Sequence, residues 1–352
     1  MREGVTTGTC AAAASKAAAM FAKSGEIPAR VCVKNLEGRE FCIEVFRIGD
    51  SFGVVKDSGD NKTHDVTHGL KIISTLTFTG KFGEIIFQAG EGVGIVTLPG
   101  LKIPVGEPAI NPVPRIMIAN SLREIFPFEQ IIVKISIPNG SEIAKHTFNE
   151  RLGIIGGLSI LGTSGVVRAW DEKAYLESLK LELNMIHALE YREIFITFGN
   201  LGEKSLRKAR NLQSRNIIQA GNYAGFVIDE AAKLGFAKII LAGHPGKLLK
   251  IAAGNFNTHS KVSDSRIEVL CTHLAILGED YELIREIYDC NLTDEALRII
   301  MQKLNRESYA KFWQNISEAV CRKCRERVNV NVNNVEFAAI FLNHEGKMFG
   351  NE

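Results

Sequence analysis

Residues 1–150 alternate apolar and polar positions in short runs that end at glycine-rich turns. An alternation with a period of two residues predicts strands that bury one face in a sheet. An alanine-rich run after Thr9 and the stretch 115–126 have the composition and spacing of helices instead. The predicted strands cover residues 30–35, 40–49, 52–57, 71–80, 84–90, 94–100 and 130–140. We therefore expect residues 1–150 to form an α+β domain with a mixed sheet.

Residues 151–352 follow a different rhythm. A helical spacing of apolar positions over 175–189 leads into units of apolar strand, glycine loop and helix. Such a succession is typical of a Rossmann-like, doubly wound α/β domain. The predicted strands are 193–199, 216–222 and 237–243, and the predicted helices are 203–214, 224–235 and 246–253. Residues 280–352 read as a helical C-terminal extension that closes with an apolar strand at 335–343.

Three of these strands end in a short glycine loop. One loop holds Gly199 and Gly202, the next holds Gly221 and Gly225, and the third is GHPGK at 243–247. Ligands of doubly wound sheets bind outside the carboxyl ends of the strands. Each glycine taken alone is explained as a tight helix-packing turn. Three such loops at one edge favour a binding site.

The composition is that of a soluble globular protein. The 352 residues carry a net charge of +2, with 45% hydrophobic and 23% charged residues. A nucleic-acid or membrane-surface protein is usually more basic, and no apolar run approaches the roughly 20 residues that span a bilayer. The seven cysteines are scattered, so we expect reduced thiols and a cytoplasmic location. Cys321 and Cys324 form a CxxC for which we expect a surface position and no metal.

The stretch GHPGKLLK resembles a phosphate-binding loop but lacks its spacing. Only two residues separate Gly243 from Gly246, and Leu248 stands where a Walker motif needs Ser or Thr. A glycine turn that opens a helix still presents backbone N–H groups to an anion. Lys247 and Lys250 add positive charge there. The alternatives are an anion site and a tight turn with surface lysines.

Several other clusters carry candidate chemistry, each beside a structural alternative. The hydroxyls of the GVTTGTC segment cap a helix or seat a ligand. The acidic loop 56–69 is a surface loop, or its carboxylates bind ribose hydroxyls or a cationic cofactor. The proline-rich wall after residue 100 offers an amide and an arginine that grips a carboxylate or pairs with Glu107. The hydroxyls are those of Thr6, Thr7 and Thr9, and the carboxylates are those of Asp57 and Asp60. The amide and the arginine of the proline-rich wall are Asn111 and Arg115.

Two further segments complete the set. The glycine-rich run 151–167 begins at Arg151 and is either a closely packed strand–turn–strand or a backbone nest around a ligand. Beyond the GHPGK helix, FNTHSKVSDSR brings together His259, Asp264 and Arg266. Histidine is a candidate acid or base, although a lone histidine is more often a surface residue. No nucleophile-elbow signature is present.

Taken in order, these segments resemble the cobalt-precorrin-5B C(1)-methyltransferases of anaerobic cobalamin biosynthesis. The resemblance covers about residues 2–275, and the tail after 280 adds nothing to it. The motifs that carry it are VTTGTCAAAASKAA, KDSGDNKTHDVTHG, GEGVGIVTLPGL, PVGEPAINPVPR, RLGIIGGLSILGTSGVV and GHPGKLLKIAAGNFNTHS.

This resemblance implies methyl transfer from S-adenosylmethionine to ring carbon C-1 of cobalt-precorrin-5B, giving cobalt-precorrin-6A. Cobalt enters only as part of the tetrapyrrole substrate, and no metal site of the protein's own is expected. A homo-oligomer is possible, and neither nucleic acid nor membrane is expected as a partner. On this basis the expected roles are catalysis by His259 and Asp264; donor binding by Gly199, Gly202, Gly221, Gly225, Asp57 and Asp60; and substrate binding by Thr6, Thr7, Thr9, Asn111, Arg115, Arg151, Lys247, Lys250 and Arg266.

Two rival functions stay open at this point. A nucleotide-using small-molecule enzyme would also employ glycine loops, but the missing Ser or Thr after Lys247 counts against it. A non-catalytic corrinoid-binding protein would bind the tetrapyrrole and not the methyl donor.

Overall fold

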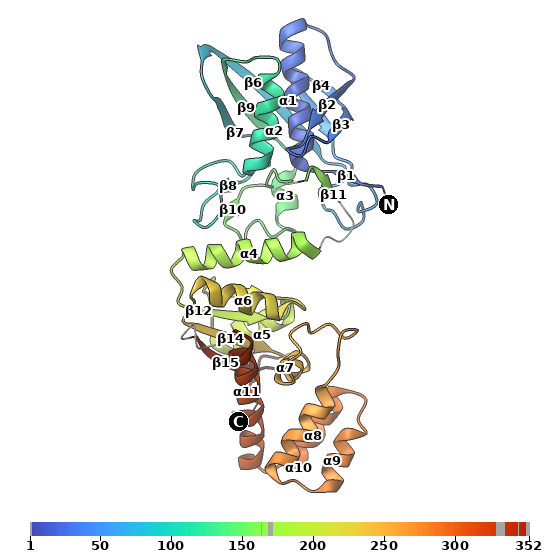
Figure 1. The fold of residues 1–352 in the computed structure, drawn as a ribbon, viewed down its shortest axis with the longest axis vertical. Helices are drawn as coiled ribbons and strands as arrows, with labels where there is room; N and C mark the ends of the chain where they lie inside the picture. The colour runs from blue at the N-terminus through green and yellow to red at the C-terminus, as the bar shows by residue number, and fades with distance from the viewer. Residues whose placement is uncertain (1, 163, 168–171, 329–334, 344, 350–352) are drawn as a thin grey trace. The chain divides into compact units, whose positions relative to one another are not determined.

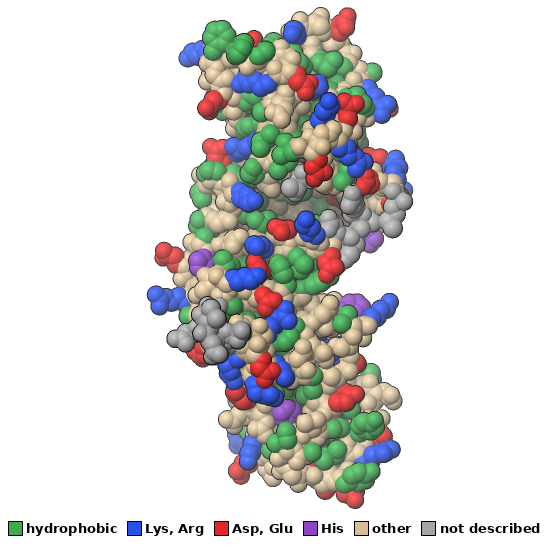
Figure 2. Space-filling view, in the orientation of Figure 1, with side chains coloured by type: hydrophobic (Ala, Val, Ile, Leu, Met, Phe, Trp, Pro, Cys, Tyr) green, Lys and Arg blue, Asp and Glu red, His purple; other side chains and the backbone are tan. Residues whose placement is uncertain are grey.

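The computed structural model of the chain describes residues 2–162, 164–167, 172–328, 335–343 and 345–349. The chain divides into two compact units, Met1–Tyr175 and Leu176–Glu352 (Figure 1). Both contain helices and sheets, which confirms the mixed α and β class. Within the described residues, no helix is both long and apolar enough to cross a membrane. Basic and acidic side chains are interspersed within each unit on the face shown in Figure 2.

The N-terminal unit is built on a five-stranded sheet with the order β4-β5-β6-β9-β7. All neighbours are antiparallel except β7 and β9, so the sheet is mixed, as predicted. A separate antiparallel hairpin, β2–β3, and two short pairs, β1–β11 and β8–β10, complete it. The strands are β1 (Gly4–Val5), β2 (Arg30–Lys34), β3 (Glu40–Glu44), β4 (Phe46–Ile48), β5 (Ser51–Val55), β6 (Lys71–Phe82), β7 (Ile85–Ala89), β8 (Ile95–Val96), β9 (Glu129–Ser136), β10 (Ile154–Ile155) and β11 (Val166–Val167).

The core of this unit forms around α1 (Thr7–Ser24) and α2 (Pro112–Arg123), which pack side by side (Figure 1). Alanines occupy most of the buried face of α1, and their small side chains let the sheet and α2 approach the helix closely. A short helix, α3 (Gly140–Ala144), follows β9. The predicted strand 94–100 is only Ile95–Val96, because Pro99 and Gly100 interrupt the ladder.

The C-terminal unit holds a fully parallel sheet with the order β13-β12-β14-β15. Its strands are β12 (Glu193–Thr197), β13 (Ile217–Gln219), β14 (Lys238–Gly243) and β15 (Glu336–Phe341). The apolar strand predicted at 335–343 is therefore an integral part of this sheet and pairs with β14 over six residues.

Helices cover this sheet. Leu206 of α5 packs with Phe195, Ile240 and Leu342 in one hydrophobic cluster, whereas α6 and α7 each contact α11. The helices are α4 (Glu172–Ala188), α5 (Asn200–Arg210), α6 (Ala224–Leu234), α7 (Pro245–Ala252), α8 (Arg266–Leu277), α9 (Tyr281–Tyr288), α10 (Thr293–Lys303) and α11 (Arg306–Val328). Three helices, α9, α10 and α11, lie in the segment predicted as a helical extension.

The cysteines differ from the sequence-based expectation in two ways. Cys32 and Cys42 form a disulfide across the β2–β3 hairpin, so the expectation that all thiols are reduced is wrong. Directly opposed positions of two antiparallel strands placed the two sulfurs together, a pairing that their spacing did not reveal. Cys321 and Cys324 are buried in α11 rather than lying on the surface, and burial raises the pKa of both thiols.

Candidate functional site: the carboxyl edge of the parallel sheet

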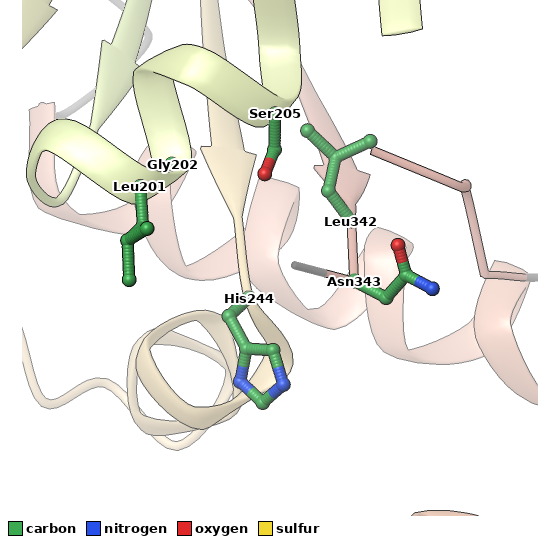
Figure 3. Close-up of a pocket in the computed structure, with 6 residues that line it drawn as sticks. All are labelled: Leu201, Gly202, Ser205, His244, Leu342 and Asn343. Carbon is green, nitrogen blue, oxygen red and sulfur yellow. The ribbon is translucent and has the colours of Figure 1, made fainter. Parts of the chain in front are cut away.

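The three glycine loops lie at one edge of the parallel sheet, as predicted. Strands β12, β13 and β14 run in the same direction, so the loops that follow them emerge together. Beside these loops is a small pocket with a cavity volume of about 40 Å³ (Figure 3). That volume holds a few water molecules or one functional group of a larger ligand. Its walls come from α5, the end of β14 and the end of β15: Leu201, Gly202, Ser205, His244, Leu342 and Asn343.

The two glycines of the first loop have open space on the side where a side chain would stand. A Cβ atom added at Gly199 would meet no atom within 4 Å, and its φ of +153° disfavours other residues. A Cβ atom added at Gly202 would make only ordinary contacts, the nearest 3.6 Å away. The first N–H groups of a helix have no intrahelical partner. Gly199, the N-cap of α5, has no side chain that could accept a hydrogen bond from them.

His244 is a pocket residue that the sequence analysis did not select. It is the N-cap of α7, and its Nδ1 accepts a bond of 3.3 Å from the backbone N–H of Gly246. The neutral ring then carries its proton on Nε2, which lies 3.3 Å from a carboxylate oxygen of Asp294. Its position directly after the third strand was the available signal.

Lys247 brings three of the sequence motifs together. Its Nζ donates to Asn222 Oδ1 at 2.8 Å and to the backbone carbonyl of Thr258 at 3.0 Å. These partners come from the loop after β13 and from the FNTHS segment. Burial lowers the pKa of the Lys247 ammonium, and the nearby charges of Lys250 and Arg266 lower it further.

Lys250 is 3% exposed and bonds inward. Its Nζ donates to the backbone carbonyls of Ser263 at 2.8 Å and Thr258 at 3.4 Å. It therefore holds the loop 255–265 in shape. Among the described residues, no carboxylate forms an ion pair with Lys247 or Lys250, so a half-buried and a buried cation have neutral partners only.

The candidate catalytic residues lie on the same loop. His259 is exposed, and its Nδ1 accepts a bond of 3.1 Å from the N–H of Lys261. The neutral ring therefore presents Nε2 as a donor rather than as a base. Asp264 makes two bonds to the Arg266 guanidinium, at 2.7 and 2.5 Å. This pairing lowers the pKa of Asp264 to about 2 and raises that of Arg266.

The second glycine loop is shaped by close packing. A Cβ atom added at Gly225 would come within 2.8 Å of both Phe256 and Arg327. Arg327 in turn pairs with Asp229, and Gly221 has a φ of +58°. Gly225 thus allows α6 to approach the FNTHS segment, whose backbone bonds to the loop through Asn222 and Thr258.

In the N-terminal unit, two of the threonines in GVTTGTC, Thr7 and Thr9, hydrogen-bond to the backbone of the segment 161–165. Thr6 caps α1 through a bond from the N–H of Thr9. Thr7 exchanges two bonds with the backbone of Leu161, at 2.9 and 3.1 Å, and Thr9 donates to the carbonyl of Gly165 at 2.8 Å. All three threonines are buried.

Several glycines of the segments 90–94 and 151–167 allow close packing of the backbone. A Cβ atom added at Gly157 would lie 2.3 Å from the backbone of Gly92, and one added at Gly162 would lie 2.2 Å from Thr6. Of the two alternatives for 151–167, the structure shows the closely packed one at these positions.

The acidic loop 56–69 contains a buried ionic network. Lys56 is 2% exposed and donates to Asp65 at 2.6 Å and to Ser58 at 2.7 Å. Burial acts to raise the pKa of Asp65, but bonds from Lys56, Thr67 and Ser58 outweigh it and lower the value to about 2. The network stabilises the loop, and sequence analysis missed Lys56 because it read the segment as acidic.

The two aspartates predicted to bind the donor lie in this loop and contact the chain terminus. Asp57 pairs with the Arg2 guanidinium at 2.8 Å, and Asp60 accepts the N–H of Arg2 at 2.6 Å.

The proline-rich wall positions its two polar residues at the start of α2. Asn111 is the N-cap of α2, and its side chain makes no cap bond. Arg115 bonds to the Ile110 carbonyl at 2.8 Å and pairs with Glu107 at 3.2 Å, which is the local alternative anticipated for it. Arg151 is half-buried and has contacts of its own.

Comparison with known proteins decides the family. The CbiD family model matches residues 1–169, and the model of the CbiD C-terminal domain matches residues 257–352. The chain belongs to the CbiD family. Relatives named cobalt-precorrin-5B C(1)-methyltransferase include those of Thermoanaerobacter sp. (42% identical; 93% of this chain and 90% of the relative) and Alkaliphilus metalliredigens (40%; 98% and 90%). The relative from Methanocaldococcus jannaschii is 37% identical, over 99% of this chain and 95% of its own.

A crystal structure of the CbiD protein from Archaeoglobus fulgidus, described as a cobalamin biosynthesis protein, is 32% identical. The match covers 76% of this chain and 84% of the crystallised chain, with a TM-score of 0.42.

Family membership corrects one expectation about the tail. The CbiD C-terminal model extends to residue 352, whereas the resemblance was expected to end near 275. The matched region contains β15, which completes the parallel sheet, and α10, which carries Asp294 beside His244. The tail thus belongs to the CbiD pattern and contributes to the site.

Proposed function

We propose that this protein transfers a methyl group from S-adenosylmethionine to C-1 of cobalt-precorrin-5B, giving cobalt-precorrin-6A in cobalamin biosynthesis. The observation that carries the proposal is its 37–42% identity, over 93–99% of the chain, to relatives that bear this activity as their name. Cobalt enters the reaction as part of the substrate. The cytoplasm, where small-molecule biosynthesis of this kind takes place, is the proposed location.

We place the methyl donor at the carboxyl edge of the C-terminal sheet, which we interpret as Rossmann-like. In a parallel sheet of order 2-1-3-4, the chain leaves the first and third strands toward opposite faces, and ligands bind in the crevice between them. Here those strands are β12 and β14, and Gly202 and His244 follow them.

The residues present fit the donor in two respects. The open backbone at Gly199 allows a planar or ribose group to lie directly on the chain. The pocket of about 40 Å³ suits one end group and not the whole molecule, so the rest of the donor lies over the glycine loops. Gly221 and Gly225 belong to the neighbouring loop. Asp57 and Asp60 contact Arg2 within the N-terminal unit, and their predicted donor role is not part of this placement.

We place substrate carboxylates near Lys247. A tetrapyrrole of this class carries several acetate and propionate groups, which need cations and N–H donors. Lys247 is half-buried without a carboxylate partner among the described residues, so an incoming carboxylate would relieve the unfavourable burial of its charge. Arg266 and the Nε2–H of His259 lie on the adjoining loop. Within the N-terminal unit, Asn111, Arg115 and Arg151 are retained as candidate substrate ligands. The predicted ligands Thr6, Thr7, Thr9 and Lys250 are buried and bonded inward, so we assign them a structural role.

The main contribution of the protein to this mechanism is to align the donor sulfur, the methyl group and the ring carbon. The donor supplies a methyl group on a positively charged sulfur, and the ring carbon attacks that methyl in line while sulfur keeps the electron pair of the broken bond. Holding the reacting atoms in line supplies much of the acceleration. Asp264 stays ionised beside Arg266, so its role is to fix that guanidinium rather than to move a proton.

One experiment tests the function directly. The purified chain is incubated anaerobically with cobalt-precorrin-5B and methyl-labelled S-adenosylmethionine, and the tetrapyrrole is analysed by mass spectrometry. We expect the gain of one labelled methyl group, located at C-1 by NMR. Binding of the tetrapyrrole without methyl gain, and without binding of the donor, would instead support the corrinoid-carrier function.

A further inference from the structure

A cluster of metal-ligand type lies on the β2–β3 hairpin, outside the proposed active site. The sulfurs of Cys32 and Cys42 and a carboxylate oxygen of Glu40 all lie within 4.8 Å of one another. Cys32 and Cys42 face each other directly in the strand register. Glu40 precedes Cys42 by two residues, which puts both side chains on one face of the strand. Its carboxylate is 4.0 Å from the Cys42 sulfur.

This face of the hairpin is turned away from the core. Val31, Val33 and Phe41 are buried on the opposite face, whereas Cys32 and Cys42 are partly exposed and Glu40 is exposed. The disulfide is therefore open to a reductant. The hairpin register is fixed independently by its backbone ladder and by the buried apolar face. The sulfurs are not needed to hold the two strands together.

Two basic side chains contact the backbone of the two cysteines. The Lys16 ammonium donates to the carbonyl of Cys32 at 2.9 Å, and the Arg30 guanidinium donates to the carbonyl of Cys42 at 2.9 and 3.1 Å. The thiolate is the form of cysteine that binds metal. Two thiolates and one carboxylate suit a borderline-soft divalent cation such as Zn²⁺, with water in the fourth position.

We propose that Cys32, Cys42 and Glu40 form a redox-gated site for one zinc-class divalent cation. A dithiol reductant donates two electrons to the disulfide and is itself oxidised to a disulfide. Each sulfur of the opened pair gains one electron, and the resulting thiolates bind the cation with Glu40. Reoxidation by a low-molecular-weight disulfide, which takes up the two electrons and is reduced to two thiols, joins the sulfurs and releases the cation. The proposal is independent of the methyltransferase function.

The test uses the full chain under anaerobic conditions, without tetrapyrrole or methyl donor. Protein reduced with a dithiol, then freed of it by gel filtration, is titrated with Co²⁺ while the sulfur-to-cobalt charge-transfer absorbance is recorded. We expect one equivalent of Co²⁺ to bind and Zn²⁺ to displace it. Oxidised protein and the Cys32→Ser variant should lack the band, and Glu40→Gln should weaken binding at least tenfold.

Glu44 provides the matched control, because it is an exposed carboxylate two residues from Cys42 on the other side and lies outside the cluster. Glu44→Gln should bind Co²⁺ as the unmodified chain does. The proposal is overturned if reduced protein gives no more absorbance than Cys32→Ser, or if the Glu40 and Glu44 variants behave alike. Labelling of both Cys32 and Cys42 by a thiol reagent after oxidation would also refute the redox gate.

Discussion

The ammonium group of Lys247 lies 2.8 Å from the side-chain oxygen of Asn222, and this contact joins the first turn of α7 to the loop after β13. Lys247 also reaches the carbonyl of Thr258, so one cation organises three loops at the carboxyl edge of the sheet. A half-buried cation with neutral partners is electrostatically unsatisfied, and it attracts an anion. This relationship links the fold of the C-terminal unit to the recognition of an acidic substrate.

Replacing Lys247 with Met should weaken tetrapyrrole binding and spare the methyl donor. A hydrogen bond to a charged group contributes about 1.5–3 kcal/mol, which corresponds to roughly 10- to 150-fold in affinity. Anaerobic titration monitored by absorbance gives the tetrapyrrole Kd, and calorimetry gives the donor Kd. Exposed Lys261 is the control, and Lys261→Met should change neither. Loss of donor binding alone in Lys247→Met would place the donor, rather than the substrate, at this cation.

Lys250→Met should reduce stability instead. The change leaves the carbonyl of Ser263 without its lysine donor and removes the weaker of two lysine donors to Thr258, which we expect to cost about 1–3 kcal/mol. The measurement is urea unfolding followed by circular dichroism, compared with Lys247→Met at the same pH. Equal stability of the two variants would contradict the structural role of Lys250.

Lys247 and Lys250 show how much of the site can be predicted from the sequence. The strand–glycine–helix pattern was sufficient to predict that the loops converge, because parallel strands place all their carboxyl ends at one edge. Sequence could not distinguish Lys247 from Lys250, since residues three apart share a helix face. Their different burial depends on how the loop 255–265 folds over that face. The same limit concealed His244, whose partner Asp294 lies fifty residues away in sequence. Pairing of Cys32 with Cys42 likewise depended on strand register.

Gly202→Ala tests the donor site. The added methyl group meets only ordinary contacts with the protein, so the fold should be retained and α5 should be slightly more stable. The same methyl group narrows a pocket of about 40 Å³, so donor affinity should fall about tenfold or more. Calorimetric titration with S-adenosylmethionine measures it. Gly246→Ala, in the first turn of α7, is the control and should bind the donor normally. Normal donor binding by Gly202→Ala would move the donor away from this pocket.

The ionisation of Asp65 should make the free energy of unfolding depend on pH. Its pKa is lowered from 3.8 to about 2 in the folded protein, so the folded state stabilises the ionised form. That contribution, about 2 kcal/mol, is fully present well above pH 4 and is lost as the pH falls through about 2. The stability difference between the unmodified chain and Asp65→Asn, measured by urea unfolding, should therefore shrink from pH 6 to pH 2. Asp60→Asn, at an exposed position, should show no comparable change.

His259 should act as a hydrogen-bond donor rather than as a general base, because the backbone N–H of Lys261 occupies its Nδ1 and leaves the proton on Nε2. Glutamine also offers an N–H donor but cannot exchange a proton at neutral pH. We therefore expect His259→Gln to retain most of the turnover and His259→Ala to lose about tenfold, mainly through KM. Steady-state methyl transfer with labelled donor measures both. Proton transfer typically contributes 10²- to 10⁴-fold, so an equal loss of that size in kcat for both variants would restore an acid–base role.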